Sequence, residues 1–277
     1  MSLPVGRLLR GAALSPSAAL IAAWFHGDPG VRVYRGALSA DILVHDVGQA
    51  IGVSFLDEAS LAIVDAATGD VVVADAAGNV LSRRGVPFAA GAGAAARTAA
   101  GWFLALSDSV PPRVRLPAGR GSWTPDSSYT RAIALGAGDG EVLVWQSFAP
   151  FRAWRIGDRT DWQPVEFQQV ATHWFPDDIA RSLHFDTGIW SSTSVVKIGP
   201  GYVQTLAHCG TDQRLLLWFD TSGQFLRYSE VAAPFGFVAS ATKAPAALAV
   251  RTLNVSELVK YSWERFPDSN RSKGERR

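Results

Sequence analysis

Short apolar runs, separated by glycine, proline, aspartate and serine, recur along the whole chain. The clearest stretch, SLAIVDAATGDVVVADAAGNVLSRRG from Ser60 to Gly85, contains three such runs. The first leads into the turn Ala67-Thr68-Gly69-Asp70 and the second into Ala77-Gly78-Asn79. Glycine and asparagine accept the positive φ angles of tight hairpins. Because long amphipathic helix patterns are nearly absent, the pattern predicts an all-β protein built from antiparallel strands.

A repeat underlies this pattern. The segment DTSGQFLRY matches DAAGNVLSR, so that Asp220 corresponds to Asp75 and Gly223 to Gly78. Copies of the middle hairpin begin at residues 19, 60, 101, 141, 201 and 246. Four of the five intervals are 40 to 45 residues long, and the interval from 141 to 201 is 60. Four strands per unit at this period are the signature of a β-propeller, and the long interval predicts an insertion at about 171–192.

The two ends of the chain complement each other. The last unit has an inner strand near 236–242 and a hairpin at 246–264 but lacks an outer strand, whereas the initial PVGRLLRG resembles the outer-strand text NVLSRRG. We therefore expect residues 3–9 to complete the last unit, which leaves no unfinished sheet edge. The sequence predicts a six-bladed propeller over residues 1–265, closed by this N-terminal strand, and a disordered basic tail at 266–277.

The strand rhythm resembles that of the six-bladed propellers of the broad NHL and strictosidine-synthase-like group. The resemblance covers nearly the whole chain but rests on spacing, because no Trp-Asp, double-glycine or Tyr-Trp-Thr-Asp motif recurs. It implies, for the lactonase-type members, a divalent metal held in the channel by a carboxylate, an Asn and an Asp. Only Asn254 could take the Asn position here, which argues against lactonase chemistry. We expect no cofactor, with a divalent metal in the channel as the alternative.

Composition narrows the classes of function. Apolar residues make up 48% of the 277 residues, and 26 Lys+Arg against 25 Asp+Glu give a net charge of +1. The apolar content and the low charge exclude a disordered chain, and the lack of a basic excess argues against a general nucleic-acid binder. Arginine supplies 22 of the basic residues. Because alanine and glycine are also abundant, we interpret the arginine excess as compositional bias rather than as a sign of anion recognition. The single cysteine, Cys209, excludes an internal disulfide and a zinc site built from several thiolates.

No apolar run reaches the roughly 18 residues that a membrane-spanning helix needs. The closest stretch, at 11–25, is interrupted by Ser15, Pro16 and Ser17. We therefore expect no export signal and a cytoplasmic location, the alternative being an exported or periplasmic protein whose true start lies upstream.

Repeat position assigns polar residues to one face of the propeller, which we call the funnel face. It comprises the loops that lead into the inner strands and the loops between second and third strands. His26, His45, Asp46 and His208 are expected on it, and imidazole is a common acid–base group near neutral pH. Two hypotheses follow. The chain is a binding module that docks a protein, a peptide or a small ligand on this face, or it is a hydrolase or lyase that uses these four residues.

The insertion at 171–192 supplies most of the binding candidates. Long loops in compact domains often form lids or binding loops. The candidates are His173, Trp174, Phe175, Asp177, Arg181, His184 and Trp190, together with Phe235 before the last inner strand. The alternative is a short helix, begun by Pro176-Asp177-Asp178, that packs its aromatic side chains against a blade.

Overall fold

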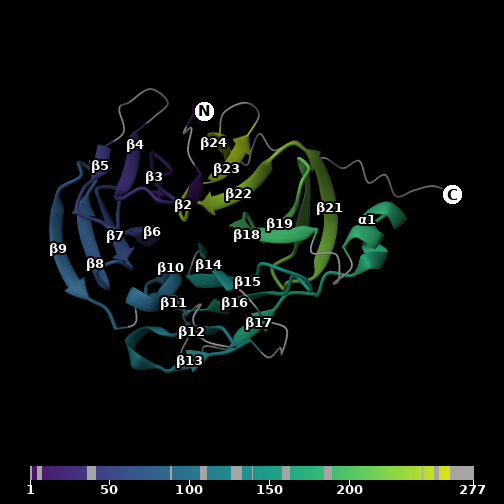
Figure 1. The fold of residues 1–277 in the computed structure, drawn as a ribbon, viewed down its shortest axis with the longest axis horizontal. Coiled ribbons are helices and arrows are strands. Elements are labelled where there is room, and N and C mark those ends of the chain that lie inside the picture. The colour runs from purple at the N-terminus through teal and green to yellow at the C-terminus, as the bar shows by residue number, and fades with distance from the viewer. Residues whose placement is uncertain are drawn as a thin grey trace.

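The chain folds into six four-stranded antiparallel sheets that form a ring (Figure 1). The structure is a computed structural model, and it describes residues 2–4, 8–35, 42–87, 89–106, 111–125, 133–138, 140–157, 163–183, 189–244, 246–252 and 256–262. Inner strands of neighbouring sheets contact one another around the ring, and the last contacts the first. Each sheet is therefore one blade of a six-bladed β-propeller.

Every blade runs from an inner strand at the centre to an outer strand at the rim. The inner strands are β2 (Leu9–Leu14), β6 (Ala50–Phe55), β10 (Ala92–Thr98), β14 (Ile133–Gly138), β18 (Trp190–Ile198) and β22 (Phe235–Ser240). The second strands are β3 (Leu20–Phe25), β7 (Ser60–Asp65), β11 (Gly101–Leu106), β15 (Glu141–Gln146), β19 (Gly201–His208) and β23 (Ala246–Thr252). The six hairpin positions predicted from the repeat are thus confirmed to within one residue.

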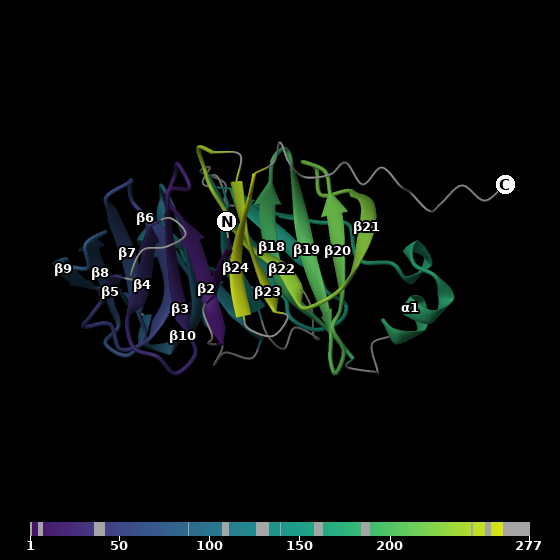
Figure 2. The same ribbon diagram turned by 90° about the horizontal axis from the view of Figure 1, so that it is seen from above.

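The outer half varies more in strand length from blade to blade. The third strands are β4 (Val31–Arg35), β8 (Asp70–Asp75), β12 (Arg113–Arg115), β16 (Ala153–Gly157), β20 (Gln213–Phe219) and β24 (Ser256–Ser262). The outer strands are β5 (Ile42–Val44), β9 (Val80–Gly85), β13 (Ser122–Trp123), β17 (Pro164–Glu166), β21 (Phe225–Ala232) and β1 (Ser2–Pro4). Figure 2 shows these strands crossing the disc between its two faces.

The N-terminal strand completes the sixth blade. β1 pairs with β24 in antiparallel register, with Ser2 opposite Val259 and Pro4 opposite Glu257. The pairing is shorter than the expected 3–9, since Leu9 already begins the inner strand of the first blade. The predicted tail at 266–277 lies outside the described residues. No helix in the described part of the chain is long and apolar enough to cross a membrane.

The matched turns of the second and fifth blades have one structure. The Asp75 carboxylate accepts hydrogen bonds from the backbone N–H groups of Ala77 and Asn79, and Asp220 accepts them from Ser222 and Gln224. Gly78 and Gly223 follow at φ of 91° and 85°, which only glycine adopts without strain. The DxxG pattern is therefore a real structural repeat.

Six apolar clusters, one at each junction between neighbouring blades, hold the ring together. At the junction of the first two blades, for example, Val33 of β4 belongs to the same cluster as Leu61 and Ile63 of β7, and all three are fully buried. Each such side chain contributes roughly 1.5–3 kcal/mol on burial. This packing makes the inner strands a rigid frame for whatever lies at the centre.

Candidate functional site: the central channel

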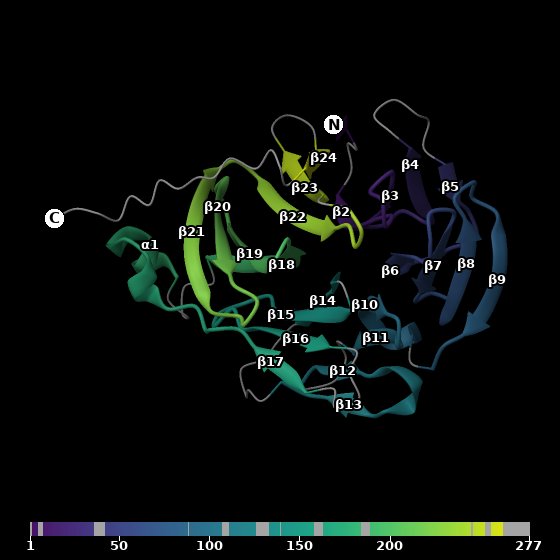
Figure 3. The same cartoon turned by 180° about the vertical axis from the view of Figure 1, so that it is seen from behind.

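A cavity of about 560 Å³ lies at the centre of the ring and is bounded by all six inner strands. Figure 3, from behind, shows the inner strands β2, β6, β10, β14, β18 and β22 around the centre of the ring. Its walls are made mostly of small residues, such as Ala13, Ala94 and Ala137. Small side chains leave the inner strands close together yet keep the centre open.

Bulges shape the wall of this channel. Five of the six described inner strands insert one extra residue into their pairing with the second strand. The extra residues are Arg10, Ile51, Gly93, Thr193 and Val238, and all five line the cavity. A bulge re-aims side chains and is common next to binding sites. The bulges, together with the usual alternation of side chains along a strand, therefore determine which side chains face the channel.

Two tryptophans of second strands also reach the channel. The ring of Trp24 covers Gly11, where a Cβ would lie 2.2 Å from a ring carbon, and the ring of Trp145 covers Gly136 in the same way at 3.3 Å. Both indoles line the cavity although they are at most 9% exposed. Any larger residue at Gly11 would displace the Trp24 ring, so these inner-strand glycines are needed for the aromatic part of the wall.

Arg10 projects across the channel near the funnel face. It is the second residue of β2, and its Nη2 atom donates to the carbonyl oxygen of Gly93, two blades away, at 3.2 Å. This bond fixes the guanidinium in front of β10. Burial lowers the pKa of Arg10 from its usual value, because a half-buried cation loses hydration.

Arg97 lines the same cavity toward the opposite face. It is the sixth of the seven residues of β10, beside the turn to β11. Burial lowers its pKa too, with no opposing charge to offset the loss of hydration. Among the described residues that line the channel, none carries a carboxylate. Within the described lining, the channel therefore holds two half-buried cations and no anion that matches them.

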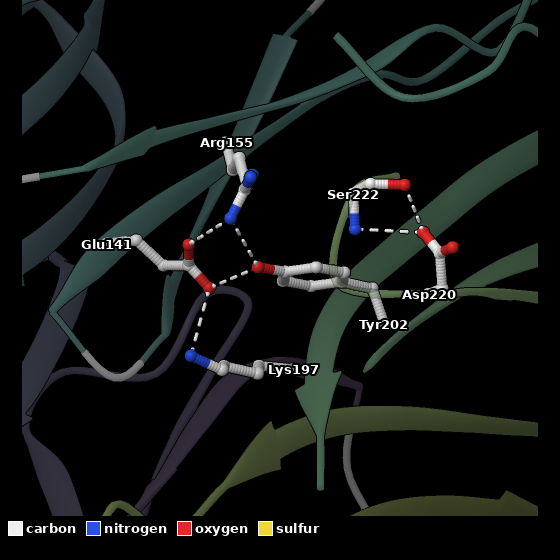
Figure 4. Close-up of polar contacts among 6 residues, drawn as sticks. All are labelled: Glu141, Arg155, Lys197, Tyr202, Asp220 and Ser222. Atoms are coloured by element: carbon white, nitrogen blue, oxygen red, sulfur yellow. Dashed lines mark hydrogen bonds and ion pairs between the residues drawn. The ribbon is translucent and has the colours of Figure 1, made fainter. Parts of the chain in front are cut away.

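A second charged cluster lies at the junction of the fourth and fifth blades, where two cations share one carboxylate (Figure 4). Glu141, the first residue of β15, accepts a hydrogen bond of 2.8 Å from the Tyr202 hydroxyl and forms ion pairs with Lys197 at 3.4 Å and Arg155 at 3.9 Å. Arg155 also donates to the Tyr202 hydroxyl at 3.3 Å. We call these four residues the inter-blade cluster.

The inter-blade cluster is suited to holding two blades together rather than to proton transfer. Burial, and then the hydrogen bond to Glu141, raise the pKa of Tyr202 to about 12. A phenol with so high a pKa stays protonated and makes a poor general base near neutral pH. The Glu141 carboxylate, 8% exposed in its side chain, is already occupied by two cations.

The structure places His26, His45, Asp46 and His208 on the funnel face but does not bring them together. His26 is exposed directly after β3 and lines the mouth of the channel. His45 and Asp46 are exposed after β5, where the Asp46 carbonyl accepts a hydrogen bond from Arg83. His208, at the end of β19, instead packs its ring edge-on against Trp190, with 4.9 Å between the ring centres.

No hydrogen bond or ion pair joins a histidine to a carboxylate within the described residues. No described group of three His, Cys, Asp or Glu residues has the geometry to hold a metal ion either. Asn254 and His184 lie outside the described residues. The hydrolase or lyase hypothesis, which requires such an acid–base pair, stays a prediction.

The described first part of the insertion, residues 171–183, lies at the outer edge of the fifth blade, whereas Trp190 already begins the inner strand β18. Figures 1 and 2 both place its helix α1 (Asp177–Ser182) outside β21. Trp174, in a short 3₁₀ helix at Thr172–Trp174, stacks on Phe225 of β21 at 3.8 Å. Phe175 is buried against Tyr228. The aromatic side chains therefore pack against a blade, which is the alternative that the sequence left open.

The remaining candidates of the insertion divide between surface and core. His173, Asp177 and Arg181 are exposed, and they stay predictions as binding residues of the rim. Trp190 is 2% exposed and donates from its indole N–H to the Ser182 hydroxyl at 2.9 Å. Phe235 begins β22 but packs against Phe237 and Tyr261. Trp190 and Phe235 thus support the core.

Sequence reasoning missed Arg10 and Arg97. A signal was present, since Arg97 interrupts AGAAARTAAG, a run of small residues, and a lone charge in such an inner strand must face an opening. Arginine abundance was explained as compositional bias, and this explanation does not account for these two positions. Recognising Arg10 would also have required knowledge of the bulge that turns it inward.

Comparison with known proteins supports the fold and no closer relationship. No family model matches the chain, and no curated protein matches its sequence. A member of the DUF4221 family from Bacteroides vulgatus superposes with a TM-score of 0.60 at 6% identity, covering 94% of both chains. The β-propeller domain of Cps50 (Swd1) from Myceliophteria thermophila gives 0.55 at 12% identity, over 95% of this chain and 99% of that one.

A streptogramin B lyase also matches with a TM-score of 0.55, at 10% identity over 95% of this chain and 86% of the other. These structures are propellers with unrelated names, and identities this low establish the architecture alone. The chain is a six-bladed β-propeller, whereas the resemblance to the NHL group remains a prediction.

Proposed function

We propose that this propeller is a binding module that takes a small ligand into its central channel. The observation that carries the proposal is the cavity of about 560 Å³, enclosed by all six inner strands. Its volume lies within the roughly 300–1,000 Å³ typical of small-molecule sites. Among the protein, peptide and small-ligand partners that the sequence allowed, the cavity favours the small ligand.

The funnel face is the proposed side of access. On this face His26 and Ser147 line the mouth of the cavity. Two apolar side chains on the same face are open to solvent, with Leu8 72% and Phe148 50% exposed. A mouth with apolar and polar groups at its border, above a cavity with aromatic walls, suits capture of an organic molecule rather than a bare ion.

Blocking the channel tests the proposal. Ala137 lines the cavity and is exposed to it, so Ala137→Trp is expected to fill the channel without disturbing the junctions. Ala77→Trp is the matched control, because Ala77 is exposed in a turn next to an outer strand. We would screen a fragment library of anions, cations and neutral molecules by saturation-transfer NMR against the wild type and both variants.

The expected result is a set of fragments that bind the wild type and Ala77→Trp but not Ala137→Trp. A set of hits that Ala137→Trp leaves unchanged would place binding elsewhere and overturn the proposal. This comparison tests where the fragments bind, and its outcome does not depend on whether they are anionic, cationic or neutral.

A further inference from the structure

We propose that the channel ligand is a small organic anion whose acidic groups are bound by Arg97 and Arg10. This inference rests on the proposed function and adds the chemical class of the ligand. It follows from the charge of the cavity rather than from its shape.

The first step is the imbalance of charge within the cavity. The whole chain is nearly neutral, with a net charge of +1, yet the described channel lining contains two arginines and no carboxylate. Removing a cation from water is unfavourable unless a partner compensates for the lost hydration. Two half-buried cations at the centre lower the stability of the fold. They therefore serve a purpose other than stability.

The second step is that other half-buried arginines of this chain do have partners. Arg155 contacts both Glu141 and Tyr202. Arg214 donates to the carbonyl oxygens of Thr211 and Gln213, and Asp212 acts on it electrostatically. The guanidinium of Arg97, by contrast, has no hydrogen bond or ion pair to any part of the chain that the structure describes. Arg97 therefore differs from Arg155 and Arg214 because of its place in the channel, and not because of its residue type.

The third step concerns Arg10. A guanidinium has five N–H donors, and the bond to Gly93 uses only one of them. That bond holds the planar group across the channel, so its other donors are already oriented for a carboxylate or phosphate, which arginine recognises through two parallel hydrogen bonds. Preorganisation of this kind lowers the entropic cost of binding.

The fourth step is the arrangement of the two cations along the channel. Arg10 is the second residue of its inner strand and Arg97 the sixth of another. Four residues of strand correspond to about 13 Å between backbone levels. The hydroxyl of Ser240 also lines the cavity. An organic molecule with two acidic groups would use both cations, whereas a single phosphate would use one.

Isothermal titration calorimetry with four probes of similar size tests the inference. Glutarate is the dianion, glutaramide its neutral analogue and 1,5-diaminopentane the matched dication, while inorganic phosphate distinguishes a compact anion from an extended one. We expect glutarate to bind most tightly, phosphate more weakly, and the neutral and cationic probes not at all. A rise in salt concentration is expected to weaken both anions.

Variants assign the effect to residues. Arg97→Met is expected to lose at least about tenfold in glutarate affinity, since hydrogen bonds to charged groups contribute about 1.5–3 kcal/mol. Arg97→Lys is expected to retain part of the affinity, which a misfolded variant would not do. Arg84→Met, at an exposed position on β9, is the matched control and is expected to bind like the wild type.

Three outcomes would overturn the inference. They are equal binding of glutaramide or diaminopentane, equal losses in Arg97→Met and Arg84→Met, and no binding of glutarate or phosphate at millimolar concentration. Neutral fragments that bind the wild type but not Ala137→Trp would, at the same time, leave the proposed function standing. Failure of the two proposals is therefore distinguishable.

Discussion

Half-buried arginines have different roles in the inter-blade cluster and in the central channel. In the cluster, Arg155 and Lys197 surround the carboxylate of Glu141, and all of them join two blades. In the channel, Arg10 and Arg97 are also half-buried, but no described carboxylate lies beside them. A cation whose partner is built into the chain stabilises the fold, whereas a cation without one is available for a ligand.

The largest effect is expected from breaking the cluster at its centre. Glu141→Gln removes the one negative charge between Arg155 and Lys197, which leaves two cations close together. We expect the free energy of unfolding, measured with urea, to fall by about 2 kcal/mol, because groups left unpaired at a buried site are costly. Glu166→Gln, in the more exposed pair with Arg152, is the matched control and is expected to cost under about 1 kcal/mol. Equal losses would show that the cluster is no more than a surface ion pair.

A pair of arginine variants sharpens the comparison. Arg155→Met is expected to lower the free energy of unfolding by about 1–2 kcal/mol, since it removes the partner of Glu141 and Tyr202. Arg97→Met, measured without added anions, is expected to leave it unchanged or raise it slightly, because an uncompensated half-buried charge disappears. A loss in Arg97→Met as large as in Arg155→Met would mean that Arg97 has a stabilising partner after all.

The smallest effect concerns the titration of Tyr202. Its pKa of about 12 in the folded protein lies above the usual value of 10.0. Below pH 10 the phenol is protonated in both states, so its contribution to stability is complete. As the pH rises from 10 to 12, the unfolded chain releases the proton first, and the contribution is lost. Burial also raises the pKa of Tyr228, so phenolate absorbance is expected to show a late titration step that Tyr202→Phe reduces. Identical curves for both proteins would contradict the buried contact.

The blade positions could be predicted because a propeller repeats its local chemistry. Each second strand is an apolar run between turns, and the turns themselves depend on neighbours in sequence, as Asp75 with Gly78 shows. Closure by the N-terminal strand followed from counting strands. The hairpins and turns need no knowledge of distant contacts, and the one distant pairing, β1 with β24, could be predicted because it was the strand that the count left over.

The site could not be predicted in the same way because it depends on contacts between blades. Arg10 faces the channel through a bulge and a hydrogen bond to a strand more than 80 residues away. The aromatic residues of the insertion were ambiguous until the structure showed Phe225 and Tyr228 of β21 beside them. Histidines that share a face by repeat position remain separated around the ring, so a shared face does not establish a shared site.

The most direct test is a crystal structure grown with selenate, a tetrahedral dianion similar to phosphate whose selenium atom is located by anomalous diffraction. We expect selenium in the channel, within hydrogen-bond distance of the guanidinium of Arg97 or Arg10. Selenium found only beside exposed arginines of the outer strands, such as Arg83 and Arg84 of β9, with none in the channel, would contradict the central claim.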